Sequence, residues 1–167
     1  MDTAVAVHPE ATYVLAERDG EKIVTAEPLV PEGAEILERR TGAELHGETY
    51  QRPPDLLPLS EFGDQAFRVL TADHVTMDSG TGIVHLSPAF GVEDLEVARR
   101  HGLPVVNPIG VNGHFLAEVP LIGDLFFHDA NDSVIAELTG RGLLAKHEPY
   151  PHSYSWVPAW PAVRRSR

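Results

Sequence analysis

DSGTGIVHLSPAFGVEDLEVARRHGLP, residues 78–104, combines the local patterns of three kinds of structure. Its glycines at 80 and 82 permit positive φ and a close approach of the backbone to another molecule. The following GIVHLS run alternates like a strand, and two acids then open a short helix predicted over residues 93–101. Gly102 ends this helix and Pro104 prevents its continuation. The stretch therefore predicts a strand, a turn and a helix in direct succession.

The residues before this stretch predict mainly short antiparallel strands. Residues 3–9 alternate, and the runs 12–18 and 21–30 flank Asp19-Gly20, a dipeptide that favours a tight hairpin turn. Residues 66–77 predict a further strand. Between these runs, Pro31 precedes apolar residues at helical spacing, which predicts a short helix over residues 31–39.

Less regular segments lie on either side of the central strands. Residues 42–65 are rich in proline and glycine and predict a long, ordered surface loop. Residues 105–120 predict a hairpin around Asn112-Gly113, and the strongest helix is expected from Asp129, as its cap, to about Leu144. An apolar stripe marks one face of that helix. Together these elements predict an α+β domain of mainly short antiparallel strands with two or three helices around one core.

Composition and charge narrow the function classes. The chain has 167 residues, 43% of them hydrophobic, no cysteine and a formal net charge of −12. No run is long enough to span a bilayer and no secretory signal is visible, so we expect a soluble, cytoplasmic protein without a membrane partner. The acidic balance has the wrong sign for a protein that grips nucleic acid by its own phosphate contacts. We therefore expect no strong polynucleotide binding by the isolated chain.

Residues 80–94, GTGIVHLSPAFGVED, resemble a motif of the editing domain (CP1) that is inserted into isoleucyl-tRNA synthetase. The related valyl and leucyl synthetases share the Gly-Thr-Gly strand and the acidic helix start, but not the histidine at position 85. The resemblance continues outside the motif and covers about residues 2–154. It implies a barrel-like editing domain over residues 1–150.

Two departures from the family pattern accompany this resemblance. The family carries a threonine-rich segment immediately before the strand at residues 3–7, whereas this sequence begins at Met1-Asp2. After Tyr154 the family continues into a cysteine zinc element, whereas this chain has no cysteine. We therefore expect a truncated fragment, with residues 151–167 as a divergent, disordered tail.

The resemblance assigns the first catalytic role to Asp94. An ionised carboxylate there would receive the α-amino group of an aminoacyl ester through a charge-assisted hydrogen bond. An acid in a first helical turn also complements the helix dipole and caps free N–H groups. Both roles can coexist, and the neighbouring Glu93 is expected to be solvated.

The resemblance places three further groups of residues around the substrate. His85 would line the pocket floor and hydrogen-bond the ester end, although a lone histidine in a strand is more often a satisfied core residue. The backbone of Gly80, Thr81 and Gly82 would approach the terminal adenosine, or the glycines would simply form a bulge. Phe90, with Pro88, would pack the turn and form a wall of the pocket.

The expected mechanism is positioning of the ester and of a water molecule, because the sequence suggests neither a Ser-His-Asp nor a Cys-His arrangement. Hydroxyls of the threonine-rich segment and of the tRNA ribose would assist. No cofactor and no metal are expected. The histidines show no i, i+4 pair, and His147 and His152 lie near a proline-rich tail.

Three functions remain open at this level. The first is proofreading by hydrolysis of valyl-tRNA(Ile). The family requires it because the one methylene that valine lacks relative to isoleucine is worth only about 1–3 kcal/mol in a binding pocket, a general figure for which this enzyme class is the standard example. Its partner would be the aminoacyl end of tRNA(Ile), held by the full synthetase. The second is a catalytically silent fragment that binds an aminoacyl-adenosine group or a protein partner. The third is an unrelated α+β binding protein.

Overall fold

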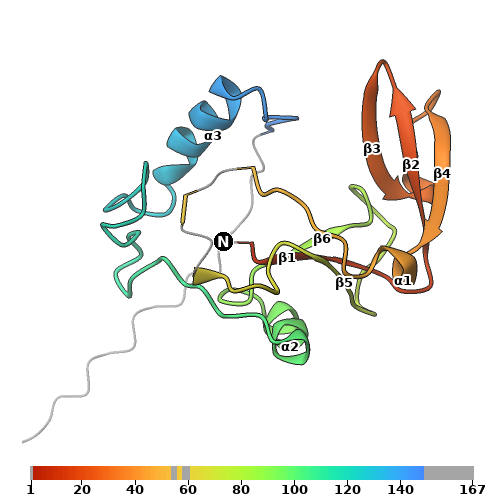
Figure 1. Cartoon of the computed structure of the whole chain (residues 1–167). Helices are drawn as coiled ribbons and strands as arrows, with labels where there is room; N and C mark the ends of the chain where they lie inside the picture. The colour runs from red at the N-terminus through yellow and green to blue at the C-terminus, as the bar shows by residue number, and fades with distance from the viewer. Residues whose placement is uncertain (1, 54–55, 58–60, 149–167) are drawn as a thin grey trace, which may run out of the picture.

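Two small sheets carry the N-terminal half of the chain in this structure, a computed structural model that describes residues 2–53, 56–57 and 61–148. The first sheet has the order β5-β1-β6. Its central strand β1 (Ala4–Val7) pairs parallel with β5 (Val69–Thr71) and antiparallel with β6 (Val84–Leu86). The strands predicted at residues 66–77 and 82–87 are therefore present but short, and both lie against the first strand of the chain (Figure 1).

The second sheet has the order β3-β2-β4 and is fully antiparallel. The predicted hairpin is confirmed, because β2 (Thr12–Arg18) and β3 (Glu21–Ala26) are joined at Asp19-Gly20, with φ of 54° and 83°. Positive φ at both central residues suits the right-handed twist of the flanking strands. Figure 1 shows this sheet at one end of the molecule, beyond the first sheet.

The helix predicted over residues 31–39 is wrong. Residues Glu35–Thr41 form the strand β4, which pairs antiparallel with β2 along the edge opposite β3. Only a 3-10 turn, η1 (Glu27–Leu29), precedes it. The backbone groups along the free edge of β2 find their partners in this segment, and that tertiary pairing outweighs the local spacing of Ile36 and Leu37.

The loop at residues 78–82 joins the two sheets. The Tyr13 hydroxyl on β2 donates a hydrogen bond to the Gly82 carbonyl at 2.7 Å. The backbone N–H of Ala26 donates to the Thr81 carbonyl at 2.8 Å. Gly82 has φ of 68°, and a Cβ atom there would lie 2.7 Å from the Ala26 Cβ. Glycine at position 82 therefore lets the loop approach the second sheet closely.

In the part of the chain that the structure describes, three helices accompany the sheets. The four-residue helix α1 (Gly42–Leu45) begins with a capping box between Thr41 and Glu44, inside the segment predicted as loop. Helix α2 (Val92–His101) and its end at Gly102, with φ of 68°, confirm the prediction for that region. Helix α3 (Ala130–Gly140) is shorter than predicted.

The details of the last part of the chain differ from expectation. Asp129 occupies the N-cap of α3, but its side chain makes no cap hydrogen bond, and the helix stops before Gly142, where φ is 68°. A turn is present at Asn112-Gly113. Its flanks meet only in an isolated bridge between Ile109 and Phe115 rather than in a regular hairpin.

The buried apolar residues of the described ranges form three clusters instead of the single core expected. The first lies between the first sheet and α2 and includes Leu70, Leu86 and Val97. The second joins the loop segments to α3 through residues such as Phe62, Ile122 and Ala130. The third lies between the sheets and contains Val7, Tyr13, Ala26 and Leu45.

The α+β class is confirmed, with the described strands arranged in two separate three-stranded sheets. Within the described ranges, no helix combines the length and apolar character that crossing a bilayer requires. The tail predicted at residues 151–167 falls outside the described residues, as does the end of the predicted domain at residues 149–150.

Candidate functional site

The Asp94 carboxylate lies where β6 turns into α2. Asp94 is half-buried in the first turn of the helix, and its Oδ2 accepts a hydrogen bond from the backbone N–H of Ser87 at 2.9 Å. A Cβ atom on Gly91 would lie 2.7 Å from the same oxygen, so glycine there leaves room for the carboxylate. The side chain is thus folded back against the turn, where its charge also complements the helix N-terminus.

Ser87 connects Asp94 to a second carboxylate. Its hydroxyl donates a hydrogen bond to Oδ1 of Asp2 at 2.7 Å, while its N–H is bound by Asp94. Neither Asp2 nor Ser87 was singled out from the sequence. Ser87 could have been noticed, because it lies inside the motif and, two residues after His85, on the same face of the predicted strand. Asp2 could not, because it is 85 positions distant and only the pairing of β1 with β6 brings it close.

An apolar cavity of about 250 Å³ is lined by Asp2, the second of these two acids. Phe90, 55% exposed, contributes to its wall, and its role in a substrate pocket stays a prediction. The other lining residues come from the loops and from α3, and include Arg52, Pro108, Phe115 and Val134. The Arg52 guanidinium lies over the rings of Phe62 and Phe67, 4.7 and 4.9 Å from their centres. A cation held on two aromatic faces gives the cavity one fixed, positively charged side.

His85 is exposed on β6, opposite Val5 of β1. The interpretation of His85 as a buried core histidine is therefore wrong. His85 and Asp94 are not among the residues that line the 250 Å³ cavity. The structure thus places Asp2 and Phe90 in one cavity, with Asp94 tied to Asp2 through Ser87 and His85 on the nearby strand surface.

The Gly80-Thr81-Gly82 backbone has a visible structural role. Thr81 accepts hydrogen bonds from the N–H of Ala26 and the hydroxyl of Thr25, and Gly82 packs against Ala26. Gly80, with φ of 65°, has open space where a Cβ would be, so of the two glycines it is the one that leaves room for another molecule. Contact of this segment with an adenosine stays a prediction.

Tyr50 is a further polar residue that the sequence did not reveal. Its hydroxyl is buried and has no hydrogen-bond partner among the residues that the structure describes. Burial, followed by the nearby Asp2 carboxylate, raises the pKa of Tyr50 to about 12. The phenol is therefore neutral over the physiological pH range. It adds no charge to the region that already holds Asp2.

Among the described residues, no three histidine, aspartate or glutamate side chains are grouped closely enough to hold a metal ion. His147 belongs to this part of the chain, whereas His152 falls outside it. The chemistry that the arrangement offers is the placement of carboxylates and a cavity around a substrate.

Comparisons with known proteins relate the chain to one group of enzymes. No family model matches it. The isoleucine–tRNA ligase of Streptomyces avermitilis is 52% identical over 158 residues, which cover 92% of this chain and 15% of the relative. The isoleucine–tRNA ligases of Thermobifida fusca and Thermus thermophilus are 48% and 41% identical, also over 92% of this chain. The chain thus spans about 15% of the length of the curated relatives that it matches.

A solved structure identifies the fold. The crystal structure of GlLeuRS-CP1, the CP1 editing domain of a leucyl-tRNA synthetase, superposes with a TM-score of 0.61 at 17% sequence identity. The match covers 89% of this chain and 79% of the other. The chain has the CP1 fold, and its sequence aligns with isoleucine-specific relatives.

Proposed function

We propose that this chain, which belongs to the isoleucyl-tRNA synthetase family and corresponds to its CP1 editing domain, hydrolyses valine that has been wrongly esterified to tRNA(Ile). The aminoacyl end of tRNA(Ile) would be its partner. With a net charge of −12, the chain would depend on other parts of a synthetase to hold the tRNA body. No cofactor is required by this proposal, and the cytoplasm is the proposed location.

One observation carries the proposal: the half-buried Asp94 carboxylate at the start of α2, held by the Ser87 N–H at 2.9 Å. This hydrogen bond fixes the side chain, so it needs little reordering when a ligand arrives. An aminoacyl ester carries a free α-ammonium group, and a fixed carboxylate is a strong acceptor for such a group. The second carboxylate, Asp2, increases the local negative charge that attracts the ammonium group.

In the proposed reaction a water molecule attacks the ester carbonyl. The carbon–oxygen bond to the ribose breaks, the ribose oxygen takes a proton, and free valine and deacylated tRNA leave. Asp94 holds the ammonium group, Phe90 forms part of the wall beside the substrate, and the exposed His85 imidazole lies on the strand that leads to the site. Gly80 leaves space for the terminal nucleoside. The acceleration of ester hydrolysis comes from positioning of the substrate and the water rather than from a nucleophilic side chain.

A second candidate function is binding without turnover. The hydrogen bonds from Ser87 to Asp94 and Asp2 hold two carboxylates close together, and such a pair can bind an ammonium group whether or not hydrolysis follows. In that case the same carboxylates would bind an aminoacyl-adenosine group or a protein partner and release it unchanged.

The test is a deacylation assay with valyl-tRNA(Ile) labelled in the valine, at high protein concentration. The chain is compared with a form that carries the threonine-rich segment before residue 3. Asp94→Asn keeps an oxygen that can accept from Ser87 but removes the charge, and Glu93→Gln is the matched control because Glu93 is exposed in the same helical turn. We expect Asp94→Asn to lower the hydrolysis rate by about a hundredfold and Glu93→Gln to leave it unchanged.

The outcomes separate the two candidates. Hydrolysis that depends on Asp94 supports the editing function. Absence of hydrolysis in both forms, together with binding of a non-hydrolysable valyl-adenosine analogue that Asp94→Asn weakens, supports binding without turnover. Hydrolysis that Asp94→Asn leaves intact would overturn the role of this carboxylate.

A further inference from the structure

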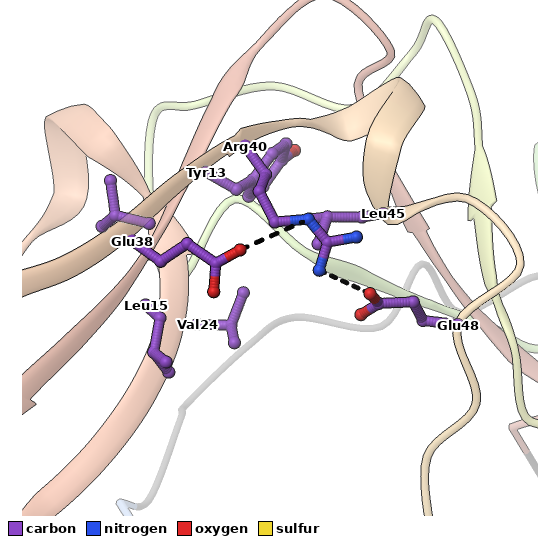
Figure 2. Close-up of a pocket in the computed structure, with 8 residues that line it drawn as sticks. Tyr13, Leu15, Val24, Glu38, Arg40, Leu45 and Glu48 are labelled. Atoms are coloured by element: carbon purple, nitrogen blue, oxygen red, sulfur yellow. Dashed lines mark ion pairs between the residues drawn. The ribbon is translucent and has the colours of Figure 1, made fainter.

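A second cavity, of about 190 Å³, lies on the β3-β2-β4 sheet and is independent of the proposed editing site. It forms on the face that carries Tyr13, Leu15 and Val24, because the register places Val24 opposite Leu15. Residues directly opposite one another in an antiparallel pair project from the same face. Figure 2 shows these side chains together with those of Arg40, Leu45 and Glu48.

The floor of this cavity is apolar and in part uncovered. Leu15 and Leu45 contribute side chains to it, and Val24 is 41% exposed. A solvent-exposed valine beside a half-buried leucine, in a concave site, is surface on which an aliphatic chain gains free energy by excluding water. The floor therefore favours a ligand with an alkyl portion.

The rim of the cavity is acidic, and its single cation is already engaged. Arg40 Nη1 lies 2.5 Å from Oε1 of Glu48, Arg40 Nε lies 3.9 Å from Oε1 of Glu38, and Nη2 donates to the Glu44 carbonyl at 2.6 Å. All three guanidinium nitrogens thus have partners, and these carboxylates raise the pKa of Arg40. The second carboxylate oxygens of Glu38 and Glu48 make no ion pair or hydrogen bond with the described residues. Two carboxylates against one guanidinium leave the rim with an excess of negative charge.

We propose that this cavity binds a lysine or arginine side chain of a basic polypeptide partner, with the aliphatic stem on Leu15, Val24 and Leu45 and the cationic head at the outer oxygens of Glu38 and Glu48. Long basic side chains bury their methylene stems while the charged head stays at a wet rim, which is the arrangement of this site. An anionic ligand is disfavoured here, because Arg40 already pairs with Glu48 and Glu38 and the rim carries two carboxylates against one guanidinium.

Charge decides between a foreign partner and a second copy of this chain. Two copies would each carry a formal charge of −12 and repel one another at low ionic strength, whereas a basic partner is steered toward the acidic surface. The occupant is therefore a basic segment rather than the same face of another copy.

Two neighbouring residues of β3 allow a matched test. Val24→Lys places an ammonium group inside the cavity, where it would occupy the site from within. Ile23→Lys adds the same charge on the opposite face of the same strand, and Ile23 is comparably exposed, at 37% against 41% for Val24. Both substitutions replace exposed side chains, so both variants are expected to fold.

The experiment follows backbone amide signals of the 15N-labelled chain during titration with Nα-acetyl-lysine methylamide. The same titration is repeated with the arginine analogue and with the neutral norleucine analogue. We expect saturable shifts centred on Leu15, Val24 and Leu45 with both cationic probes. The norleucine analogue should bind about fivefold more weakly, because it lacks the cationic group and therefore loses a half-exposed ion pair with the carboxylates. Ile23→Lys binds as the unmodified chain does, and Val24→Lys does not bind.

Three results would overturn the proposal. Norleucine binding as tightly as lysine would show that the carboxylates do not select a cation. Equal binding by Val24→Lys and Ile23→Lys would place the probe elsewhere. Concentration-dependent shifts at these residues without any probe would show that a second copy of the chain covers the site. None of these readouts depends on the deacylation assay.

Discussion

The Tyr13 hydroxyl and the Gly82 carbonyl, 2.7 Å apart, form a buried hydrogen bond between the second sheet and the loop that leads to the candidate site. The same hydroxyl accepts from the backbone N–H of His8 at 3.0 Å, so it joins three segments of the chain. Burial raises the pKa of Tyr13, which keeps the phenol protonated as the donor that this bond requires.

Tyr13→Phe is expected to lower the free energy of unfolding by about 1–3 kcal/mol, because the Gly82 carbonyl and the His8 N–H both lose a buried partner. Urea denaturation followed by circular dichroism measures this change. Ring packing is retained in the variant, so a loss below the error of the measurement would mean that water replaces the phenol without cost.

Gly82→Ala is expected to cost about 2–4 kcal/mol, because the new Cβ meets the Ala26 Cβ at 2.7 Å and alanine disfavours a φ of 68°. Gly80→Ala is the matched control. Gly80 has a similar φ of 65° but open space around it, so only the backbone cost of about 1 kcal/mol remains. Equal unfolding midpoints for the two variants in urea would contradict the close approach at position 82.

His101 makes the stability of the chain depend on pH near neutrality. Burial lowers the pKa of His101 below its ordinary value of 6.5, and the charges of His46, whose ring centre is 5.5 Å away, and Arg100 lower it further. A hydrogen bond with the Thr71 backbone opposes this shift in part. The unfolded chain therefore takes up a proton before the folded chain does, and stability falls as the pH drops below about 6.5.

The measurement compares urea unfolding at pH 7.5 and pH 5.5. His101→Gln should reduce the loss of stability between the two values, and His46→Gln should reduce it partly, since it removes one of the smaller causes. A variant His101→Gln with an unchanged pH dependence would assign the effect to other groups.

Glu44 should also make the stability fall on acidification, but at lower pH than His101 does. The backbone N–H and the hydroxyl of Thr41 both bind its carboxylate and lower the pKa of Glu44 below its ordinary value of 4.5. Its contribution is complete above pH 4.5 and is lost as the pH falls through the lower, folded value. The difference in unfolding free energy between the unmodified chain and Glu44→Gln should therefore be larger at pH 7 than at pH 3. A difference that grows on acidification would refute the role of the capping box.

The local rules of the sequence predicted the elements whose signals are complete within a few residues. The Asp19-Gly20 hairpin and the end of α2 at Gly102 depend on backbone angles that these residues themselves prefer, and both are confirmed. The strand β4 was missed because its partner groups lie on β2, and a local helical spacing carries no information about that edge. α3 ends early because two glycines, 140 and 142, follow its apolar stripe.

The candidate site was predictable only in part. The motif placed Asp94 at a helix start and Phe90 on a turn, and the structure has both there. Asp2, Arg52 and Tyr50 come from segments that meet the motif through long-range packing, and no spacing rule connects them to it. Alternation along the strand could not predict the exposure of His85. The strand β6 has only three residues and lies at a sheet edge, so one of its side chains is left exposed.

The pairing of β1 imposes an order on the folding of the chain. Val5 meets Val69 on one side and His85 on the other, so the first sheet cannot close until residue 86 is available, and its loops must be ordered before any contact stabilises them. The β3-β2-β4 sheet needs only residues 12–41, which are contiguous. During synthesis on the ribosome the β3-β2-β4 sheet is therefore expected to form first and to present Tyr13 for the later contact with Gly82. The strand β1, although synthesised first, can complete its sheet only after β6 has been synthesised.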